Sequence, residues 1–146
     1  MGFLGISTAN KTARVSSKYK DGAFSTTNQA DIGAAVAQAL APAIAPKTAN
    51  QILRVHTLTA SPAEIVAAFE TASGSKYTLQ ETDLDAEFAA AQQKLQQGDF
   101  SVVGTLILRA TVDPRTGNNF EQTGTLSNEL LELPARGLAE TVQTLV

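Results

Sequence analysis

Apolar and polar residues alternate in several short stretches of the chain, and this period of two is typical of β-strands. These stretches are rich in β-branched residues and are bounded by turn residues, which strengthens the prediction. The predicted strands cover residues 11–17, 23–27, 52–57 and 76–81. The dipeptide Asp21-Gly22, a common turn signal, separates the first two.

Apolar residues recur every three or four positions in other segments, as they do on one face of a helix. The predicted helices cover residues 28–40, 61–74 and 82–98, and a last helix carries Leu138, Val142 and Leu145. Residues 99–112 fit both patterns, because β-branched residues favour a strand while Asp99 could cap a helix. Residues 41–51 and 113–124 are rich in turn residues and are expected to be loops.

The helix predicted over residues 61–74 has the clearest end signals in the chain. Ser61 can act as N-cap, Pro62 suits the first helical position, and Glu64 completes a capping box. Gly74 can adopt the left-handed conformation that ends many helices. The segment is therefore expected to be helical whatever packs against it.

The helix predicted over residues 28–40 has a similar start signal. Asn28 is the expected N-cap, and Asp31 is the expected capping-box partner three residues later. Its apolar positions are Ile32, Val36, Ala39 and Leu40, and prolines at 42 and 46 are expected to stop it. Strands alternate with helices in the first part of the chain, so the fold class is α/β or α+β, in one domain of residues 1–146.

Composition and charge exclude several functions. The chain has 43% hydrophobic and 17% charged residues, an ordinary globular composition. Its net charge is −3, with no basic stripe of the kind that binds a phosphate backbone, so nucleic acid is not an expected partner. It has no cysteine, which excludes thiol catalysis and cysteine-based metal sites. The N-terminal apolar patch is shorter than the roughly 20 residues of a membrane span and lacks signal-peptide features, so a cytoplasmic location is expected.

No catalytic constellation is evident from the residues. His56 is the single histidine and lies in a predicted strand, where a packed or surface-facing role is expected. Asp83, Asp85 and Glu87 fall in the first turn of a predicted helix, where acids interact favourably with the helix dipole, so no metal site is expected. No glycine-rich loop stands between a strand and a helix, so the dinucleotide fingerprint is missing.

Several segments together resemble one known family. The stretches NKTARV, DGAFSTTNQADIGAAVAQAL and LRVHTLTASPAEIVAAFETASGSKYTLQETDLD, followed by LQQGDF and NELLELP, are similar to the NmrA-like and isoflavone-reductase-like family of atypical short-chain dehydrogenases. The resemblance covers only the C-terminal, substrate-side half of that Rossmann-fold family. It implies short strands with about five helices, and a helix over residues 100–111.

The resemblance also implies that the cofactor and the substrate are held by different halves of the full-length protein. In the full-length family the N-terminal Rossmann half holds the cofactor, usually NADP(H), so this chain alone is expected to bind none. The resemblance therefore assigns no catalytic or cofactor-binding residue to the chain. Phe3, Leu4, Phe100 and Leu106 are the candidate lining of a pocket for a small organic substrate, and aromatic compounds are the family's better-known choice. Core packing would account for the same four residues.

Three functions remain open from the sequence. The first is the substrate-binding half of an NAD(P)H-dependent reductase-like protein, inactive by itself, with Met1 an internal or wrongly assigned start. The second is a non-catalytic, dinucleotide-sensing transcriptional regulator of the same superfamily. The third is a free-standing protein-interaction module.

Overall fold

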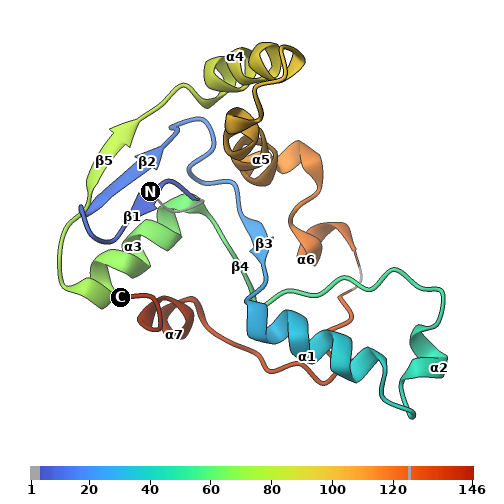
Figure 1. Ribbon diagram of the computed structural model, residues 1–146. Helices are drawn as coiled ribbons and strands as arrows, with labels where there is room; N and C mark the ends of the chain where they lie inside the picture. Colours follow the sequence, from blue (N-terminus) through green and yellow to red (C-terminus); the bar gives the residue numbers. More distant parts are fainter. Residues whose placement is uncertain (1–3, 125) are drawn as a thin grey trace.

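The computed structural model describes residues 4–124 and 126–146. Within these residues the chain forms seven α-helices, two 3-10 helices and five short strands, arranged in two small sheets (Figure 1). The prediction of a mixed α/β chain is confirmed.

The two sheets have different strand directions. The first has the order β1 (Ile6–Ser7), β2 (Thr12–Val15) and β5 (Thr78–Glu81); β1 runs antiparallel and β5 parallel to β2. The second is an antiparallel pair of β3 (Phe24–Thr26) and β4 (Leu58–Ala60). Because β2 and β3 lie in different sheets, the turn around Asp21 joins two sheets instead of closing a hairpin.

The helices agree with the sequence pattern except for two short additions. Their bounds are α1 Gln29–Ala39, α2 Ala45–Thr48, α3 Pro62–Ser73, α4 Leu84–Gln96, α5 Val103–Val112, α6 Phe120–Thr123 and α7 Leu138–Gln143, with 3-10 helices η1 Phe100–Val102 and η2 Pro114–Thr116. The predictions of loops over 41–51 and 113–124 were wrong where they missed α2, α6 and η2. Pro46 lies in the first turn of α2, where proline is tolerated. It therefore helps to start α2, in addition to preventing a helix from continuing through this position.

The end signals of α3 are confirmed in full. The Ser61 side chain accepts a hydrogen bond from the Glu64 amide, and the Glu64 carboxylate accepts one from the Ser61 amide at 2.8 Å. Gly74 is left-handed, with φ of 61°. Ile65, Val66 and Phe69 on this helix are buried and pack into the main hydrophobic core.

The strand predicted over residues 52–57 was wrong, and the strand lies just after it at β4. The reason is that the backbone of the earlier segment is hydrogen-bonded elsewhere. The Asn128 side chain accepts from the His56 amide at 3.1 Å and donates to the His56 carbonyl at 2.7 Å. The Ser127 amide donates to the Arg54 carbonyl. A distant loop therefore takes the bonds that a neighbouring strand would have made.

The helix α1 has the predicted bounds, but the prediction of which face is buried was wrong. Asn28 is the N-cap residue, yet its side chain does not cap the helix, and Asp31 is buried instead of closing a capping box. The Thr57 hydroxyl donates to Asp31 at 2.5 Å, and Arg136 donates to it at 3.3 Å. These polar contacts turn Asp31 inward, so the predicted apolar face points outward.

The ambiguous segment over residues 99–112 is helical, as η1 followed by α5. This confirms the helix over residues 100–111 that the family resemblance implied. Asp99 accepts from the Ser101 amide at the start of η1. The helix α5 packs on α4, and Val112 at its end joins the core.

Candidate functional site

An apolar groove of about 340 Å³ lies between β1, the β3–β4 pair, α3 and α7. This volume is at the lower end of the range of about 300–1,000 Å³ that small-molecule sites occupy. Its apolar lining includes Leu4, Ile6, Leu58, Ile65, Phe69 and Leu138. A second cavity, in the core beside Tyr19 and Phe24, measures about 30 Å³, which is room for about one water molecule. Of these two cavities, the groove is the better candidate for a ligand.

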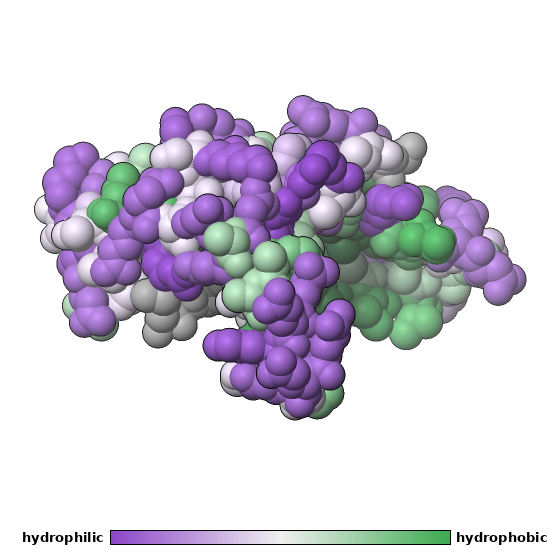
Figure 2. Space-filling view, turned by 90° about the horizontal axis from the view of Figure 1, so that it is seen from above, coloured by the Kyte–Doolittle hydropathy of each residue, from purple (hydrophilic) through white to green (hydrophobic). Residues whose placement is uncertain are grey.

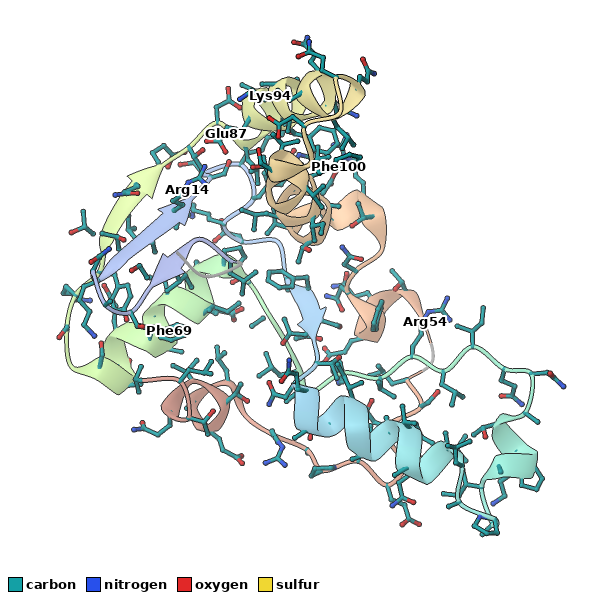
Figure 3. All side chains as sticks on the ribbon, in the orientation of Figure 1. Arg14, Arg54, Phe69, Glu87, Lys94 and Phe100 are labelled. Carbon is teal, nitrogen blue, oxygen red and sulfur yellow. The ribbon has the colours of Figure 1, made fainter. Side chains whose placement is uncertain are left out.

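The groove is built by two helices that pack against each other. The helix α3 presents Ile65 and Phe69, four residues apart on one face, and α7 presents Leu138 and Val142 at the same spacing. Phe69 extends from the middle of α3 (Figure 3). The centre of the Phe69 ring lies 6.3 Å from the centre of the Tyr77 ring, and this aromatic contact holds the Phe69 side chain in place.

A few polar groups interrupt this apolar lining. Thr8, Thr26, Asn28 and Thr141 line the groove. The Oγ1 atom of Thr141 is buried and has no hydrogen-bond partner among the residues that the structure describes. A buried hydroxyl without a partner costs free energy, and a ligand that displaces the atoms covering it could recover that cost with a hydrogen bond. The arrangement suits a small apolar molecule that carries one polar group.

The structure describes three of the four residues that the sequence placed in one pocket, and it does not bring these three together. Leu4 lines the groove, but Phe100 lies in η1 with 73% of its surface exposed, and Leu106 is half-buried in α5. Figure 3 shows Phe100 at the junction of α4 and α5. Phe3 lies outside the described residues. The structure therefore does not bring Phe100 or Leu106 to the groove, and a substrate-lining role for them stays a prediction.

Sequence reasoning recognised the groove residues as apolar helix faces but did not identify them as a site. Ile65, Phe69, Leu138 and Val142 all belong to predicted faces. Periodicity indicates that such faces are buried, but it does not indicate what they pack against. The unpaired hydroxyl of Thr141 is a tertiary feature, and no sequence signal marks it.

His56 has more polar neighbours than its sequence context suggests. Its Nδ1 lies 3.1 Å from Thr59 Oγ1 and 3.7 Å from Glu121 Oε1, and Thr59 Oγ1 is 2.9 Å from Ser25 Oγ. A catalytic histidine contacts its nucleophile and its orienting carboxylate through opposite ring nitrogens. Here both neighbours face Nδ1, and Ser25 Oγ accepts from the Phe120 amide. The geometry is that of a packed histidine, without an activated nucleophile.

The three acids at the start of α4 make structural contacts. Asp83 caps the helix by accepting from the Ala86 amide at 3.1 Å. Glu87 accepts from Arg14 of β2 at 2.5 Å, and Figure 3 shows the two residues facing each other across α4 and the sheet. Asp85 belongs to a separate network described next. Among the described residues no group of three or more histidine and acidic side chains is placed to hold a metal ion.

An ion-pair network, buried at Arg109 and Asp113 and partly exposed at Asp85, joins α4, α5 and the loop after β2. The Arg109 guanidinium donates to Asp85 and to Asp113, each at 2.6 Å, and lies 4.4 Å from the centre of the Tyr19 ring. The Tyr19 hydroxyl donates to Asp85 at 2.7 Å, and Lys18 also donates to it. The hydrogen bonds from Lys18, Tyr19 and Arg109 hold the pKa of Asp85 far below its usual range. Hydrogen bonds from Arg115 and Arg109, opposed by burial, lower the pKa of Asp113 in the same way.

These lowered pKa values predict that the fold is less stable in acid. A carboxylate with a lowered folded-state pKa stabilises the fold above its unfolded pKa of about 4, and this contribution is lost as the pH falls toward the folded pKa. The urea midpoint is therefore expected to be level near neutral pH and to drop steadily below about pH 4. Urea titrations across this range test this, with Asp85→Asn expected to flatten the drop. An equal drop in the variant would contradict the assignment to Asp85.

Comparison with known proteins finds a similarity to a curated oxidoreductase. The chain is 26% identical to the oxidoreductase aprR of Aspergillus flavus over 144 residues, which are 99% of this chain and 48% of that protein. The chain thus spans about half the length of the curated relative it matches. No family model matches the chain. No solved structure matches it either.

None of the described helices is both long enough and apolar enough to cross a bilayer.

Proposed function

We propose that this chain supplies the substrate-side part of a reductase-like protein of the NmrA-like type, and that its apolar groove holds a small, apolar, aromatic substrate. The observation that carries the proposal is the groove itself, with its apolar walls and the unpaired Thr141 hydroxyl. The similarity to an oxidoreductase of about twice the aligned length supports the reaction class.

The described residues do not fit a dinucleotide cofactor. Such a cofactor places its pyrophosphate at the N-terminus of a helix, behind a glycine-rich turn that follows a strand. The helix α3 follows β4 through Ser61 and Pro62, and its first amides already have partners: the Ala63 amide donates to the Lys20 carbonyl, and the Glu64 amide donates to the Ser61 side chain. The helix α1 follows β3 through Thr27 and Asn28, again without glycine. In this proposal NADP(H) is held by residues beyond these 146.

Two titrations test the proposal on the purified chain. NADPH fluorescence should show no saturable binding, and micromolar binding would overturn the placement of the cofactor elsewhere. Cinnamyl alcohol and its hydroxyl-free analogue 1-phenylpropene should both shift the NMR signals of groove residues. If neither compound shifts them, the groove is not a site for this class of substrate.

Replacing Thr141 with valine is expected to change the affinity for one of these two ligands and not for the other. Valine keeps the shape but removes the unpaired hydroxyl, so the free protein should gain about 1 kcal/mol of stability. Affinity for cinnamyl alcohol should fall about 3- to 10-fold, which is the effect of one net hydrogen bond, while affinity for 1-phenylpropene should not change.

The matched control is Thr105→Val, the same change on α5, a helix that contributes no lining residue to the groove. It should leave both affinities unchanged. Equal loss of both ligands in Thr141→Val would contradict a hydrogen bond to the hydroxyl.

A further inference from the structure

The outward face of α1 is a row of large apolar side chains. Ile32, Val36 and Leu40 recur every fourth residue and are 49%, 57% and 73% exposed. Asp31 and Ala35, on the other face, are buried. Figure 2 shows hydrophobic residues gathered at the right of the view, over the arm that contains α1 and α2. A continuous apolar row of this kind on a soluble protein marks an interaction surface.

The same segment carries no charge. Residues 32–46 contain neither acidic nor basic side chains, and Gln38 is their only strongly polar member. By contrast α3, α4 and α7 all carry charged residues. A surface without charge is matched by a partner surface without charge, because an unpaired charge buried against it would be costly. A second copy of α1 has such a surface.

The face of α1 is also complementary to itself in shape. A row of small residues, Gly33, Ala37 and Ala41, runs beside the row of large ones. A Cβ atom added at Gly33 would meet nothing within 4 Å, so the space above this row is open. When large side chains recur every four residues, they form a ridge along the helix. Such a ridge packs into the groove between two ridges of a second helix, at a crossing angle of about −50°. Each copy of α1 offers both the ridge and the groove that a two-fold axis requires.

We propose that this face of α1 is the interface of a homodimer, formed by two copies of the chain that cross their α1 helices. The α1–α2 arm extends away from the α3, α4 and α5 side of the molecule (Figure 1). Two arms can therefore cross while the bodies of the two copies stay apart. The proposal uses no residue of the groove.

Analytical ultracentrifugation of the whole chain, from about 1 to 200 µM, tests the proposal over the usual range of weak to moderate homodimers. The chain should sediment as a dimer at the upper concentrations. The double variant V36E/L40E should dimerise at least about 100-fold more weakly, because it buries charges without partners. At concentrations where the wild type is also monomeric, its circular dichroism and melting should match those of the wild type, since both side chains are exposed in the single copy. Salt should not weaken the dimer, because no charges pair across it.

The control variant is Leu79→Glu, which places the same charge at another exposed apolar residue, on strand β5. It should leave the dimer intact. Cysteine cross-linking gives a second readout, because the chain has no cysteine of its own. Ala37→Cys should form a covalent dimer on oxidation, whereas Gln92→Cys on α4 should not.

Three results would overturn the proposal. The first is a wild-type chain that stays monomeric throughout, which would mean that something other than a second copy covers α1. The second is a V36E/L40E variant that dimerises as well as the wild type. The third is a dimer that Leu79→Glu dissociates, which would place the interface on the edge of the sheet instead.

Discussion

Replacing Phe24 with alanine is expected to cost about 3–5 kcal/mol of folding free energy, the usual loss for a buried phenylalanine. Phe24 is 2% exposed and begins β3, where it pairs with Ala60 of β4. Its ring belongs to the core cluster that joins the sheets to α3 and α7. Natural domains have a total stability of about 5–15 kcal/mol, so the loss is a large part of the whole.

Urea unfolding followed by circular dichroism measures this loss. Phe100→Ala is the matched control, because the same side chain is 73% exposed in η1 and its removal should change stability by no more than about 0.5 kcal/mol. Similar losses in the two variants would contradict the placement of Phe24 in the core and Phe100 on the surface.

Replacing Arg109 with methionine is expected to destabilise the fold by about 3 kcal/mol, near the lower end of the range for breaking a buried ion pair. Methionine keeps the length of the side chain but removes the donors to Asp85 and Asp113 and the contact with the Tyr19 ring. Asp113 then stays buried with only Arg115 to pair with. The loss arises mainly from this carboxylate, which keeps its desolvation cost without its buried partner.

Arg115→Met is the control for this effect, because it removes the other arginine from the same carboxylate. The Arg115 side chain is 73% exposed, against 9% for Arg109, so its ion pair is screened by water and its loss should cost about 0–1 kcal/mol. Urea unfolding at neutral pH compares the two variants. Equal losses would show that burial of Arg109 does not set the strength of the network.

Local signals in the sequence determined both ends of α3. The capping box of Ser61 and Glu64 and the left-handed Gly74 involve neighbouring residues, so they fix α3 without reference to the rest of the chain. The resemblance to a reductase-like family decided the helical state of residues 99–112, which periodicity left open.

The sequence alone determined that this is a mixed α/β chain with amphipathic helices, and it excluded cysteine chemistry. The tertiary structure decided three other features: that β4 begins at Leu58, that Asp31 points inward, and that α3 and α7 enclose a groove. Each depends on contacts between distant residues, such as Asn128 with His56 and Arg136 with Asp31. The physical reason is that a backbone amide or a carboxylate can be satisfied by several partners, and only the folded chain determines which of them lies within reach.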